Sequence, residues 1–448
     1  MPTLQDKIAD RTAHVAIIGL GYVGLPLTTA FARAGFRVTG LDVDQRKVNA
    51  IAASQSYIPD VPDDDLAPHV QSGRLVATSD YDVLHEVDAI FICVPTPYDA
   101  QRAPDLTYIQ DASEGILPRL KPGQLVVLQS TTYPGTTEEI VQPILEQSGL
   151  EAGEDFYLAF SPERIDPGNK QWSAYNTPKV VGGLTPECTQ LAADLLRQMG
   201  APVHPVSSPR AAELTKLLEN TFRAVNIALV NELALLTERM GIDFWEVIEA
   251  ARTKPFGFMP FYPGAGVGGH CIPVDPYYLS WKAREYDYYT EFIELAGEVN
   301  QAMPYHVVDL VSRSLSLHGK PVRNARVLVL GVAFKTDIDD ARNSPAERVI
   351  ELLLGRGAAV RYHDSYVLRF QVGGDVFHRE PVVLESAPLT EEEIAAADCV
   401  VIVTGHRSLD YAQVVKHANL IVDTCNVTAG ISDDGKKIVR LGAPLPQP

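Results

Sequence analysis

The sequence has no long hydrophobic run, few cysteines and no excess of positive charge. A membrane-spanning helix needs about 20 consecutive apolar residues, and no stretch of the 448 residues approaches that length. The first residues also lack a small-residue cleavage site after their apolar stretch. We therefore expect neither a signal peptide nor contact with a membrane.

The cysteines are odd in number and far apart in the chain. This spacing gives no disulfide framework, so we expect reduced thiols and a cytoplasmic protein. No CxxC pair or HxxxH spacing is present, and we expect no metal site. The five cysteines are Cys93, Cys188, Cys271, Cys399 and Cys425.

The formal net charge of −19 argues against binding to nucleic acid, whose phosphates would be repelled. It still allows a small phosphate-bearing ligand that is held by backbone amides and a few basic side chains. With 46% hydrophobic and 21% charged residues, the chain has the composition of a globular protein. Its length predicts two or three domains.

The segment HVAIIGLGYVGLPLTTAFARAGFRVTGLD predicts a strand, a GxGxxG turn, a helix and a second strand. The turn contains Gly19, Gly21 and Gly24, and the second strand ends at Asp42, roughly 20 residues further on. In dinucleotide-binding folds such glycines let the backbone approach a pyrophosphate, and the acid binds a ribose. Because Asp42 would repel a 2′-phosphate, the motif favours NAD over NADP. A tight turn in some other parallel sheet is the alternative.

Polar residues follow three further predicted strands. The strand within 87–97 runs into a loop, the strand within 124–137 leads to Thr131, and FYLAF is followed by Glu163 and Arg164. The carboxyl ends of parallel strands meet at one edge of a sheet, where ligands bind. Together these residues predict a site, although each alone is also typical of a turn or a helix cap.

Residues 209–240 contain no glycine and only one proline, at the start, and their apolar residues recur at helical spacing. We predict one long helix with Glu213, Lys216 and Asn220 on one face. A solvated surface lysine is the alternative interpretation of Lys216. The helix is expected to bridge two α/β halves and to offer a dimer surface.

The loop GAGVGGHCIPVDP, residues 264–276, follows a predicted helix over 244–252 and precedes another over about 280–301. Its glycines allow close approach of a ligand, and its prolines stiffen the exit. Cys271 in this loop is a candidate nucleophile, and a small buried residue is the alternative.

The pattern of the first domain returns after residue 321. Residues 326–334, 358–365 and 397–406 repeat the strand motifs of the first half at nearly the same spacing, which indicates an internal duplication. The second copy lacks two of the three glycines, so we expect it to bind the other ligand. The tail after Ile438 reads as a frayed end.

These patterns predict an α/β protein with three parts. An N-terminal Rossmann-type parallel-sheet domain is expected over 1–206, and a central long-helix connector with the cysteine loop over 207–318. A second Rossmann-like domain is expected over 319–448.

Seven motifs spread over about residues 12–430 resemble those of the UDP-sugar 6-dehydrogenases. They are GLGYVGLP, CVPTP, STTYPGTT, SPERIDPGN, ELTKLLENTFRAVNIALVNE, GVGGHCIPVDP and GVAFKTDIDDARNSP. The region around the cysteine is most similar to the branch that oxidises UDP-N-acetylglucosamine for surface polysaccharides. The UDP-N-acetylmannosamine and UDP-glucose enzymes are the alternatives.

The resemblance implies an NAD-dependent, four-electron oxidation of the sugar C6 hydroxyl to a carboxylate. The reaction would proceed through a thiohemiacetal and a thioester on the cysteine. The resemblance also implies a homodimer or a larger assembly, with residues 254–261 as the candidate arm that completes a neighbour's site.

Roles for individual residues follow from the same resemblance. Cys271 matches the catalytic cysteine and Asp275 its partner, and the other catalytic positions are Lys216, Asn220, Glu163 and Thr131. The cofactor positions are Gly19, Gly21, Tyr22, Val23, Gly24, Asp42, Lys47, Pro95, Thr96, Thr131, Lys335 and Arg342. The substrate positions are Glu163, Arg164, Lys216, Asn220, Tyr262, Gly266, Gly268, Gly269, Phe334 and Lys335.

Two positions depart from the pattern of the family. Pro167 stands where the UDP-glucose enzymes have a second glutamate, and Cys425 stands where many members have an arginine. Two other functions remain open. One is a two-electron dehydrogenase of the hydroxyacid type, which would need no cysteine, and the other is a non-catalytic nucleotide-sensing module.

Overall fold

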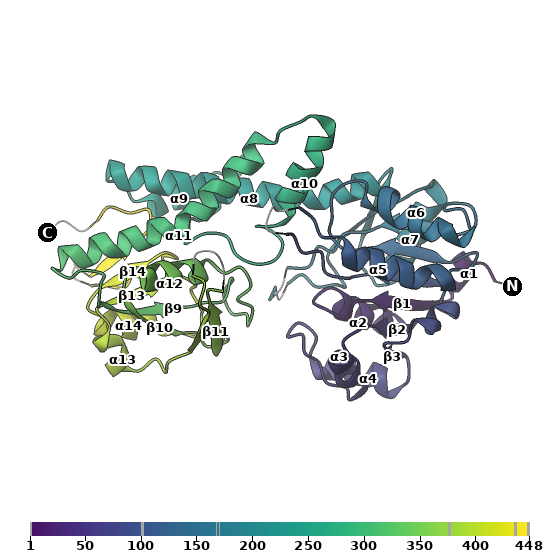
Figure 1. Ribbon diagram of the computed structural model, residues 1–448, viewed down its shortest axis with the longest axis horizontal. Helices are drawn as coiled ribbons and strands as arrows, with labels where there is room; N and C mark the ends of the chain where they lie inside the picture. Colours follow the sequence, from purple (N-terminus) through teal and green to yellow (C-terminus); the bar gives the residue numbers. More distant parts are fainter. Residues whose placement is uncertain are drawn as a thin grey trace. The chain divides into compact units, whose positions relative to one another are not determined.

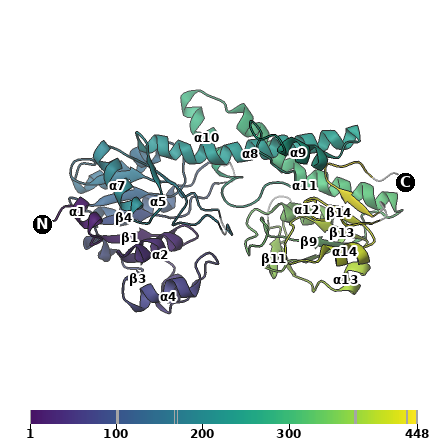
Figure 2. The ribbon, with the colours of Figure 1, turned by 180° about the vertical axis from the view of Figure 1, so that it is seen from behind.

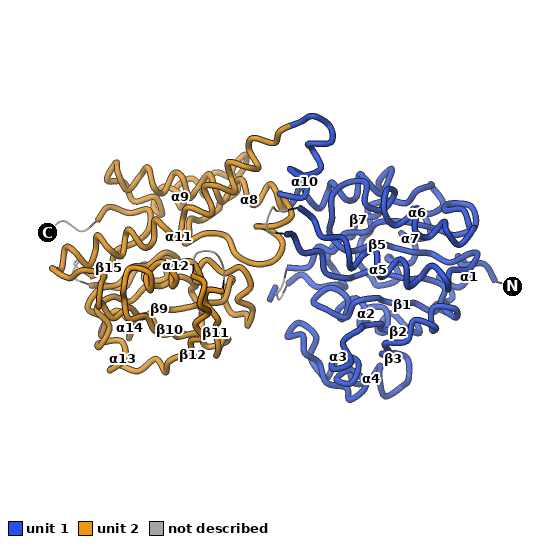
Figure 3. Tube along the Cα trace, in the orientation of Figure 1, with its two compact units in different colours: residues 1–219, 277–288 blue, residues 220–276, 289–448 orange. Residues whose placement is uncertain are grey.

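The chain folds into two units, each built around its own parallel sheet (Figure 3). The computed structural model describes residues 2–99, 103–166, 168–169, 171–374, 378–433 and 437–445, so Pro167 lies outside the described residues. The first unit comprises residues 1–219 and 277–288, and the second comprises 220–276 and 289–448. The chain passes between the units three times: within helix α8 (Pro209–Met240), within helix α10 (Asp275–Ala283), and after Tyr288.

An eight-stranded sheet forms the centre of the first unit. Its strands are β1 (His14–Ile18), β2 (Arg37–Leu41), β3 (Leu75–Thr78), β4 (Ala89–Ile92), β5 (Leu125–Leu128), β6 (Tyr157–Phe160), β7 (Lys179–Gly183) and β8 (Val203–Pro205). Their order is β3-β2-β1-β4-β5-β6-β7-β8, and only β6 and β7 pair antiparallel. This is the Rossmann order, in which the connections reverse between β1 and β4, and ligands bind at the carboxyl ends of those strands.

Helices cover both faces of this sheet (Figure 1). They are α1 (Leu4–Ala9), α2 (Gly24–Ala34), α3 (Gln45–Ala52), α4 (Asp63–Gln71), α5 (Thr107–Ile116), α6 (Gln142–Leu145) and α7 (Pro186–Arg197). Alternate residues of β1 enter different cores. Val15 and Ile17 pack with α2 and α7, whereas Ala16 and Ile18 pack with α5. Burial on both faces explains why the strand is continuously apolar in the sequence.

The second unit is a smaller version of the same plan, with a five-stranded sheet (Figure 2). Its strands are β9 (Arg326–Leu330), β10 (Ala359–His363), β13 (Cys399–Ile402), β14 (Ile421–Asp423) and β15 (Ile438–Arg440). They lie in the order β10-β9-β13-β14-β15 and all pairs are parallel. The connections reverse between β9 and β13, which is the binding position for a ligand in this sheet. A separate antiparallel hairpin consists of β11 (Arg369–Val372) and β12 (Val382–Glu385).

Five helices belong wholly to the second unit as the structure describes it. They are α9 (Phe244–Arg252), α11 (Glu291–Leu317), α12 (Pro345–Gly355), α13 (Glu391–Ala396) and α14 (Tyr411–His417). Val327 and Val329 of β9 pack against α11 and α12, and Leu328 and Leu330 pack against α13 and α14. The prediction of two Rossmann-type α/β parts joined by a long helix is thus confirmed. Within the described ranges, no helix combines the length and apolar character needed to span a bilayer.

The long helix over 209–240 and the helix over 244–252 are confirmed, but the predicted helix over 280–301 is wrong. Helix α10 ends at Ala283 and α11 begins only at Glu291. Asp287 between them has φ 53°, a left-handed conformation that ends a helix. The apolar periodicity continues across this break, so periodicity alone could not locate it.

The prediction of a frayed tail after Ile438 is also wrong. Residues 438–440 form the edge strand β15, and Leu441 is fully buried. The Leu441 carbonyl accepts a hydrogen bond of 2.7 Å from the indole N–H of Trp245, and the Gly442 carbonyl accepts one of 2.8 Å from the N–H of Phe244. These contacts attach the tail to the start of α9.

Candidate active site

The glycine loop between β1 and α2 has the geometry of a dinucleotide cradle. Gly19 has φ +92°, and a Cβ there would lie 2.6 Å from the carbonyl oxygen of Cys93. A Cβ on Gly24 would lie 1.7 Å from the carbonyl oxygen of Gly19. A Cβ on Gly21 would have no neighbour within 4 Å. Two glycines are therefore required by the fold itself, whereas the third leaves open space beside the loop.

The amino end of α2 faces the same loop. Val23 occupies its N-cap position without a side-chain hydrogen bond, and the first turn contains no acidic residue. The positive end of the helix dipole therefore suits a diphosphate. With the space beside Gly21, the loop formed by Gly19 to Gly24, including Tyr22, fits the dinucleotide that the motif implies.

Asp42 at the end of β2 fixes the loop from the other side. Its carboxylate accepts hydrogen bonds from the N–H of Leu20 at 2.8 Å and from the N–H of Asp44 at 2.9 Å. The ammonium group of Lys47 pairs with the same carboxylate at 2.8 Å. The sequence predicted both charged residues at the cofactor, and the structure brings them together.

The loops after β4 and β5 lie next to the reversal point of the sheet. The Ser130 hydroxyl donates to the carbonyl of Val94 at 2.8 Å, and the Thr96 carbonyl accepts a hydrogen bond from the hydroxyl of Tyr278. Thr131 is half-buried directly after Ser130, and Pro95 is exposed.

Glu213 of α8 anchors the loop that follows β5. Its buried carboxylate accepts hydrogen bonds from the N–H groups of Gly135 at 2.6 Å and Thr137 at 3.0 Å. The Thr137 hydroxyl donates to it at 2.7 Å. Burial raises the pKa of Glu213 despite these donors. Its position on the predicted helix face could be anticipated, but its partners could not.

Glu163 lies in a buried polar cluster at the end of β6. The Lys179 ammonium, which is 0% exposed, lies 3.0 and 3.1 Å from its two carboxylate oxygens. Gln129 donates to the same carboxylate at 2.8 Å, and the N–H groups of Arg164 and Ile165 donate at 2.7 and 2.9 Å. Neither Lys179 nor Gln129 was predicted from the sequence. A lysine that opens an apolar strand was the available signal for the former.

Lys216 is a buried residue and not a solvated surface lysine. Its ammonium donates to the backbone carbonyl of Glu163 at 2.7 Å. The neighbouring Arg164 pairs with Glu219 of α8 at 2.6 Å and donates to the carbonyl of Pro178 at 2.7 Å. In the first unit, α8 thus reaches the predicted residues at the end of β6.

In the second unit, Asn220 contacts the segment that follows the cysteine. Its side-chain amide donates to the Asp275 carboxylate at 2.5 Å, and both residues are buried. The N–H of Asp275 donates to the carbonyl of Cys271 at 2.8 Å, so the chain turns tightly between the thiol and α10. Asn220, which is distant in the sequence, therefore forms one cluster with Asp275 and with the backbone of Cys271.

The other described thiols are poorer candidates for a nucleophile. Cys93, Cys188 and Cys399 are buried, whereas Cys271 and Cys425 are partly accessible. Burial raises the pKa of the Cys425 thiol to about 12, and the carboxylate of Asp423 adds to this effect. Thiolate is the reactive form, so a raised pKa disfavours attack by Cys425.

The glycines before Cys271 pack against a segment of the second sheet. A Cβ on Gly268 would lie 2.8 Å from Cβ of Phe334 and 2.9 Å from the carbonyl oxygen of Asn343. A Cβ on Gly269 would lie 2.9 Å from the Phe334 ring, and one on Gly266 would lie 3.2 Å from the Asn300 carbonyl oxygen. Packing inside the unit therefore accounts for glycine at positions 266, 268 and 269, and no ligand is needed to explain it.

The remaining predicted residues of the second unit lie in two places. Phe334, Lys335 and Arg342 belong to the segment that follows β9, where Arg342 pairs with Asp340 at 2.5 Å and contacts His270 at 3.3 Å. Tyr262 instead lies against α9. Its hydroxyl donates to Glu249 at 2.9 Å, and its ring stacks on Trp245 with centroids 5.9 Å apart.

Family comparison covers most of the chain. Residues 13–200 match the NAD binding domain of the UDP-glucose/GDP-mannose dehydrogenase family. Residues 210–302 match the central domain of that family, and residues 328–430 match its UDP binding domain.

Individual relatives agree with this assignment. The UDP-N-acetyl-D-glucosamine 6-dehydrogenase of Pseudomonas aeruginosa is 41% identical over 80% of this chain and 84% of its own length. The UDP-N-acetyl-D-mannosamine dehydrogenase of Pyrococcus horikoshii is 34% identical over 92% of this chain and 96% of its own. A solved structure of UDP-D-ManNAc dehydrogenase from Pyrococcus horikoshii superposes with a TM-score of 0.85 at 32% identity, covering 96% of this chain and 99% of that one. The chain therefore belongs to the UDP-glucose/GDP-mannose dehydrogenase family and is an NAD-dependent UDP-sugar dehydrogenase.

Proposed function

We propose that the protein oxidises the C6 hydroxyl of UDP-N-acetylglucosamine to the carboxylate, as a step in the synthesis of a surface polysaccharide. The choice of sugar is supported by the 41% identity to the Pseudomonas aeruginosa UDP-N-acetyl-D-glucosamine 6-dehydrogenase. The choice of a four-electron reaction is supported by the cluster of Cys271, Asp275 and Asn220, because a two-electron alcohol oxidation needs no thiol.

The overall reaction consumes one UDP-sugar, one water and two NAD⁺. It yields one UDP-uronate, two NADH and three protons. NAD supplies the hydride acceptor at each of the two oxidations. This cofactor would be held at the reversal point of the first sheet by Gly19, Gly21, Gly24, Asp42 and Lys47. Tyr22, Val23, Pro95, Thr96 and Thr131 are the further contacts that we assign to this cofactor.

Cys271 retains the substrate between the two oxidations. Its thiolate attacks the C6 aldehyde and forms a carbon–sulfur bond, and the resulting thiohemiacetal loses a second hydride to become a thioester. Water then breaks the carbon–sulfur bond, which releases the carboxylate and restores the thiol. The aldehyde is never free to dissociate.

Lys216 and Asn220 stabilise the oxyanion that forms on C6. They lie one turn apart on α8, and each donor contributes on the order of 3 kcal/mol in such sites. A water held near Asp275, or Lys216 once it has lost its own proton, accepts the hydroxyl proton in the first oxidation.

Thr131 and Glu163 orient the water that hydrolyses the thioester. The Glu163 carboxylate already accepts hydrogen bonds from Lys179, Gln129 and two backbone N–H groups. We therefore assign it an orienting role and not that of the proton acceptor.

The UDP moiety is assigned to the second sheet, at the carboxyl ends of β9 and β13, with Phe334, Lys335 and Arg342 in reach of the ligand. Arg164, Tyr262 and the glycines at 266, 268 and 269 complete the proposed substrate contacts. The functional parts are then an NAD-binding part over 1–206, a central part over 207–318 and a UDP-sugar-binding part over 319–448.

The working protein is a homodimer or a larger homo-oligomer. Large apolar side chains remain exposed along α8 at intervals of four and seven residues, which places them along one side of the helix. Multi-angle light scattering measures the mass directly, and a monomer of 48.9 kDa would contradict the assembly. The exposed residues are Leu214, Leu218, Phe222, Leu229 and Leu236.

The substrate is tested by incubating the protein with NAD⁺ and one UDP-sugar at a time while NADH is followed. We expect the highest kcat/KM with UDP-N-acetylglucosamine. The 34% identity to the mannosamine enzyme makes UDP-N-acetylmannosamine the alternative, and a preference for that sugar or for UDP-glucose would overturn the choice. A protein that binds NAD⁺ but oxidises none of these sugars would support a nucleotide-sensing role.

A further inference from the structure

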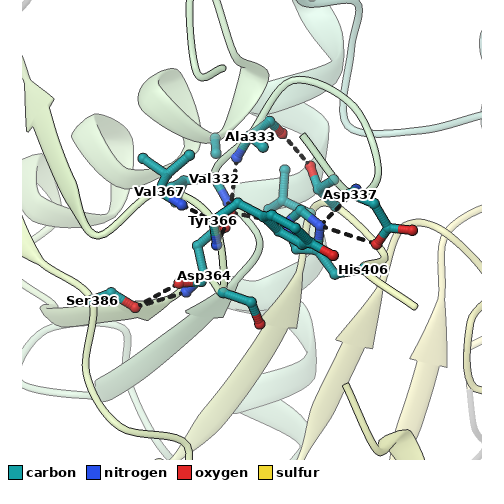
Figure 4. Close-up of polar contacts among 12 residues, drawn as sticks. Val332, Ala333, Asp337, Asp364, Tyr366, Val367, Ser386 and His406 are labelled. Carbon is teal, nitrogen blue, oxygen red and sulfur yellow. Dashed lines mark hydrogen bonds and ion pairs between the residues drawn. The ribbon is translucent and has the colours of Figure 1, made fainter. Parts of the chain in front are cut away.

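His406 lies buried at the point where the connections of the second sheet reverse. It follows β13, is 0% exposed, and contacts two aspartates that come from different loops (Figure 4). Its Nε2 lies 2.9 Å from the Asp364 carboxylate, and its Nδ1 accepts a hydrogen bond of 2.9 Å from the backbone N–H of Asp337. The proposed reaction does not use this histidine.

The hydrogen bonds determine the state of the imidazole. A backbone N–H can only donate, so Nδ1 must carry a lone pair, and Nε2 must carry the proton that it donates to Asp364. The ring is therefore a neutral bridge between a carboxylate on one side and an amide on the other. Tyr366 covers it, with ring centroids 5.0 Å apart.

Asp364 forms the fixed side of this bridge. Its carboxylate accepts hydrogen bonds from the N–H groups of Val332 at 2.7 Å and Ala333 at 3.0 Å, directly after β9. It also accepts from the N–H groups of Tyr366 and Val367 at 2.8 and 3.0 Å. Burial disfavours its charge, but these donors and His406 outweigh that effect and lower the pKa of Asp364 to about 2.

Asp337, on the other side of the bridge, links His406 to the residues proposed to bind UDP. It lies in the segment 333–345, between Lys335 and Arg342, and has φ 59°, an uncommon conformation for a residue with a side chain. The N–H of Arg407 donates to its carboxylate at 2.9 Å, and the Arg407 guanidinium pairs with it. Partners on both its backbone and its side chain hold this residue in that conformation.

The segment 333–345 in turn supports the loop that carries Cys271. The N–H of Gly269 donates to the carbonyl of Arg342 at 3.0 Å, and the side-chain amide of Asn343 donates to the carbonyl of Gly269 at 3.0 Å. Phe334 fills the space that side chains at Gly268 and Gly269 would occupy. A shift of the segment would therefore move the cysteine loop with it.

We propose that His406 is a positioning residue: through the N–H of Asp337 it holds segment 333–345, and thereby orients both the UDP-binding residues and the Cys271 loop. This inference rests on the proposed function, which assigns UDP binding to segment 333–345 and the reacting thiol to the Cys271 loop. It assigns to His406 no contact with substrate or cofactor.

Two conservative variants test the two hydrogen bonds of the His406 ring separately. In His406→Asn the amide oxygen takes the place of Nδ1 and keeps an acceptor for Asp337, whereas in His406→Gln the amide nitrogen takes the place of Nε2 and keeps only the donor to Asp364. His318→Asn is the matched control, because the hydrogen bond described for the His318 side chain goes to the Ser314 carbonyl within α11 and not to a residue of segment 333–345.

Three readouts are measured on the full-length protein: affinity for UDP, affinity for NAD⁺, and the rate of Cys271 alkylation by iodoacetamide, located by mass spectrometry. We expect His406→Gln to weaken UDP binding about tenfold and to change the alkylation rate at least threefold, with NAD⁺ affinity unchanged. His406→Asn and the control should stay within twofold of the parent. Equal behaviour of the Gln variant and the parent, or equal losses in the Asn and Gln variants, would overturn the proposal.

Hydrogen exchange of the parent protein provides a test that needs no variant, in case the variants do not fold. The Asp337 amide should be protected to the same degree as the amides of β9. Rapid exchange at this amide would overturn the proposal. Alkylation and exchange require no turnover, so a parent protein that oxidises no UDP-sugar would contradict the proposed function and leave this test intact.

Discussion

Asp42 and Asp364 occupy matching positions in the two sheets, at the ends of β2 and β10. Each carboxylate accepts hydrogen bonds from the backbone that follows the neighbouring strand, at Leu20 in the first unit and at Val332 in the second. Their other partners differ, because Asp42 pairs with Lys47 whereas Asp364 bonds His406. Asp42 thus retains a polar, partly accessible neighbour that suits a ribose, and Asp364 serves only to hold its loops.

Gly21 provides a prediction about the cofactor alone. Alanine there meets no protein atom within 4 Å, so Gly21→Ala should leave the melting temperature nearly unchanged. The new methyl group would stand where the pyrophosphate approaches, and NAD⁺ affinity should fall at least tenfold. Calorimetric titration with NAD⁺ and a thermal melt measure the two effects.

Gly24→Ala is the matched comparison for that variant. Its Cβ would lie 1.7 Å from the Gly19 carbonyl oxygen, so the melting temperature should fall strongly. Equal stability of the two variants, or normal NAD⁺ binding by Gly21→Ala, would contradict the assignment of this loop.

His14 provides a prediction about pH. Burial lowers its pKa from 6.5 to about 4, and Arg37 adds to the effect. Between these pH values the unfolded chain binds a proton that the folded protein does not. The free energy of unfolding should therefore fall as the pH decreases through that window, by roughly 3 kcal/mol in total.

Urea denaturation at pH 7, 5.5 and 4.5 measures this loss. The His14→Gln variant lacks the titrating group and should lose about 2 kcal/mol less than the parent between pH 7 and pH 4.5. Parallel losses in the two proteins would show that other groups dominate the acid response.

The secondary structure that could be predicted from sequence was local in origin. The glycine turn, the strand before Asp42 and the helix over 209–240 depend on residues close in the chain, and all three are confirmed. The pair of Lys179 and Glu163 could not be predicted, because it arises where β7 lies antiparallel beside β6. The spacing of residues in the sequence does not indicate which strand of a mostly parallel sheet runs antiparallel to its neighbour.

The glycine run before Cys271 is a second case in which distant contacts decide. Its composition suggested space for a sugar, but the neighbours of Gly268 are Phe334 and Asn343, which belong to the segment after β9. Sequence alone could identify the loop as special. Only the fold supplies a reason for Gly266, Gly268 and Gly269, whereas a Cβ on Gly264 would meet no atom within 4 Å.

The tail beyond Ile438 should be essential to the second unit. A chain ended at Lys437 would lose β15, the buried Leu441 and the acceptor of the Trp245 indole N–H. We expect the free energy of unfolding of this unit to fall by at least about 3 kcal/mol, from lost apolar burial and an unpaired donor. NAD⁺ binding serves as the internal control, since it belongs to the first unit. A truncated chain with an unchanged urea midpoint would contradict the structural role of the tail.

The two sheets of the molecule share a plan but have diverged in their loops. After β1 the chain forms a short glycine turn, and after β9 it forms the longer segment 333–345, which contacts the cysteine loop. Duplication of a nucleotide-binding unit accounts for an enzyme that must bind two nucleotides, NAD and a UDP-sugar. The cysteine loop and α8, to which we assign the reacting groups, belong to neither copy.

The number of NADH molecules formed per molecule of UDP-N-acetylglucosamine tests the central proposal most directly. With limiting sugar and excess NAD⁺, the account predicts two NADH for each uronate, and Cys271→Ser should abolish release of the uronate. One NADH per product, or a serine variant that forms the acid at the parent rate, would contradict the covalent four-electron mechanism.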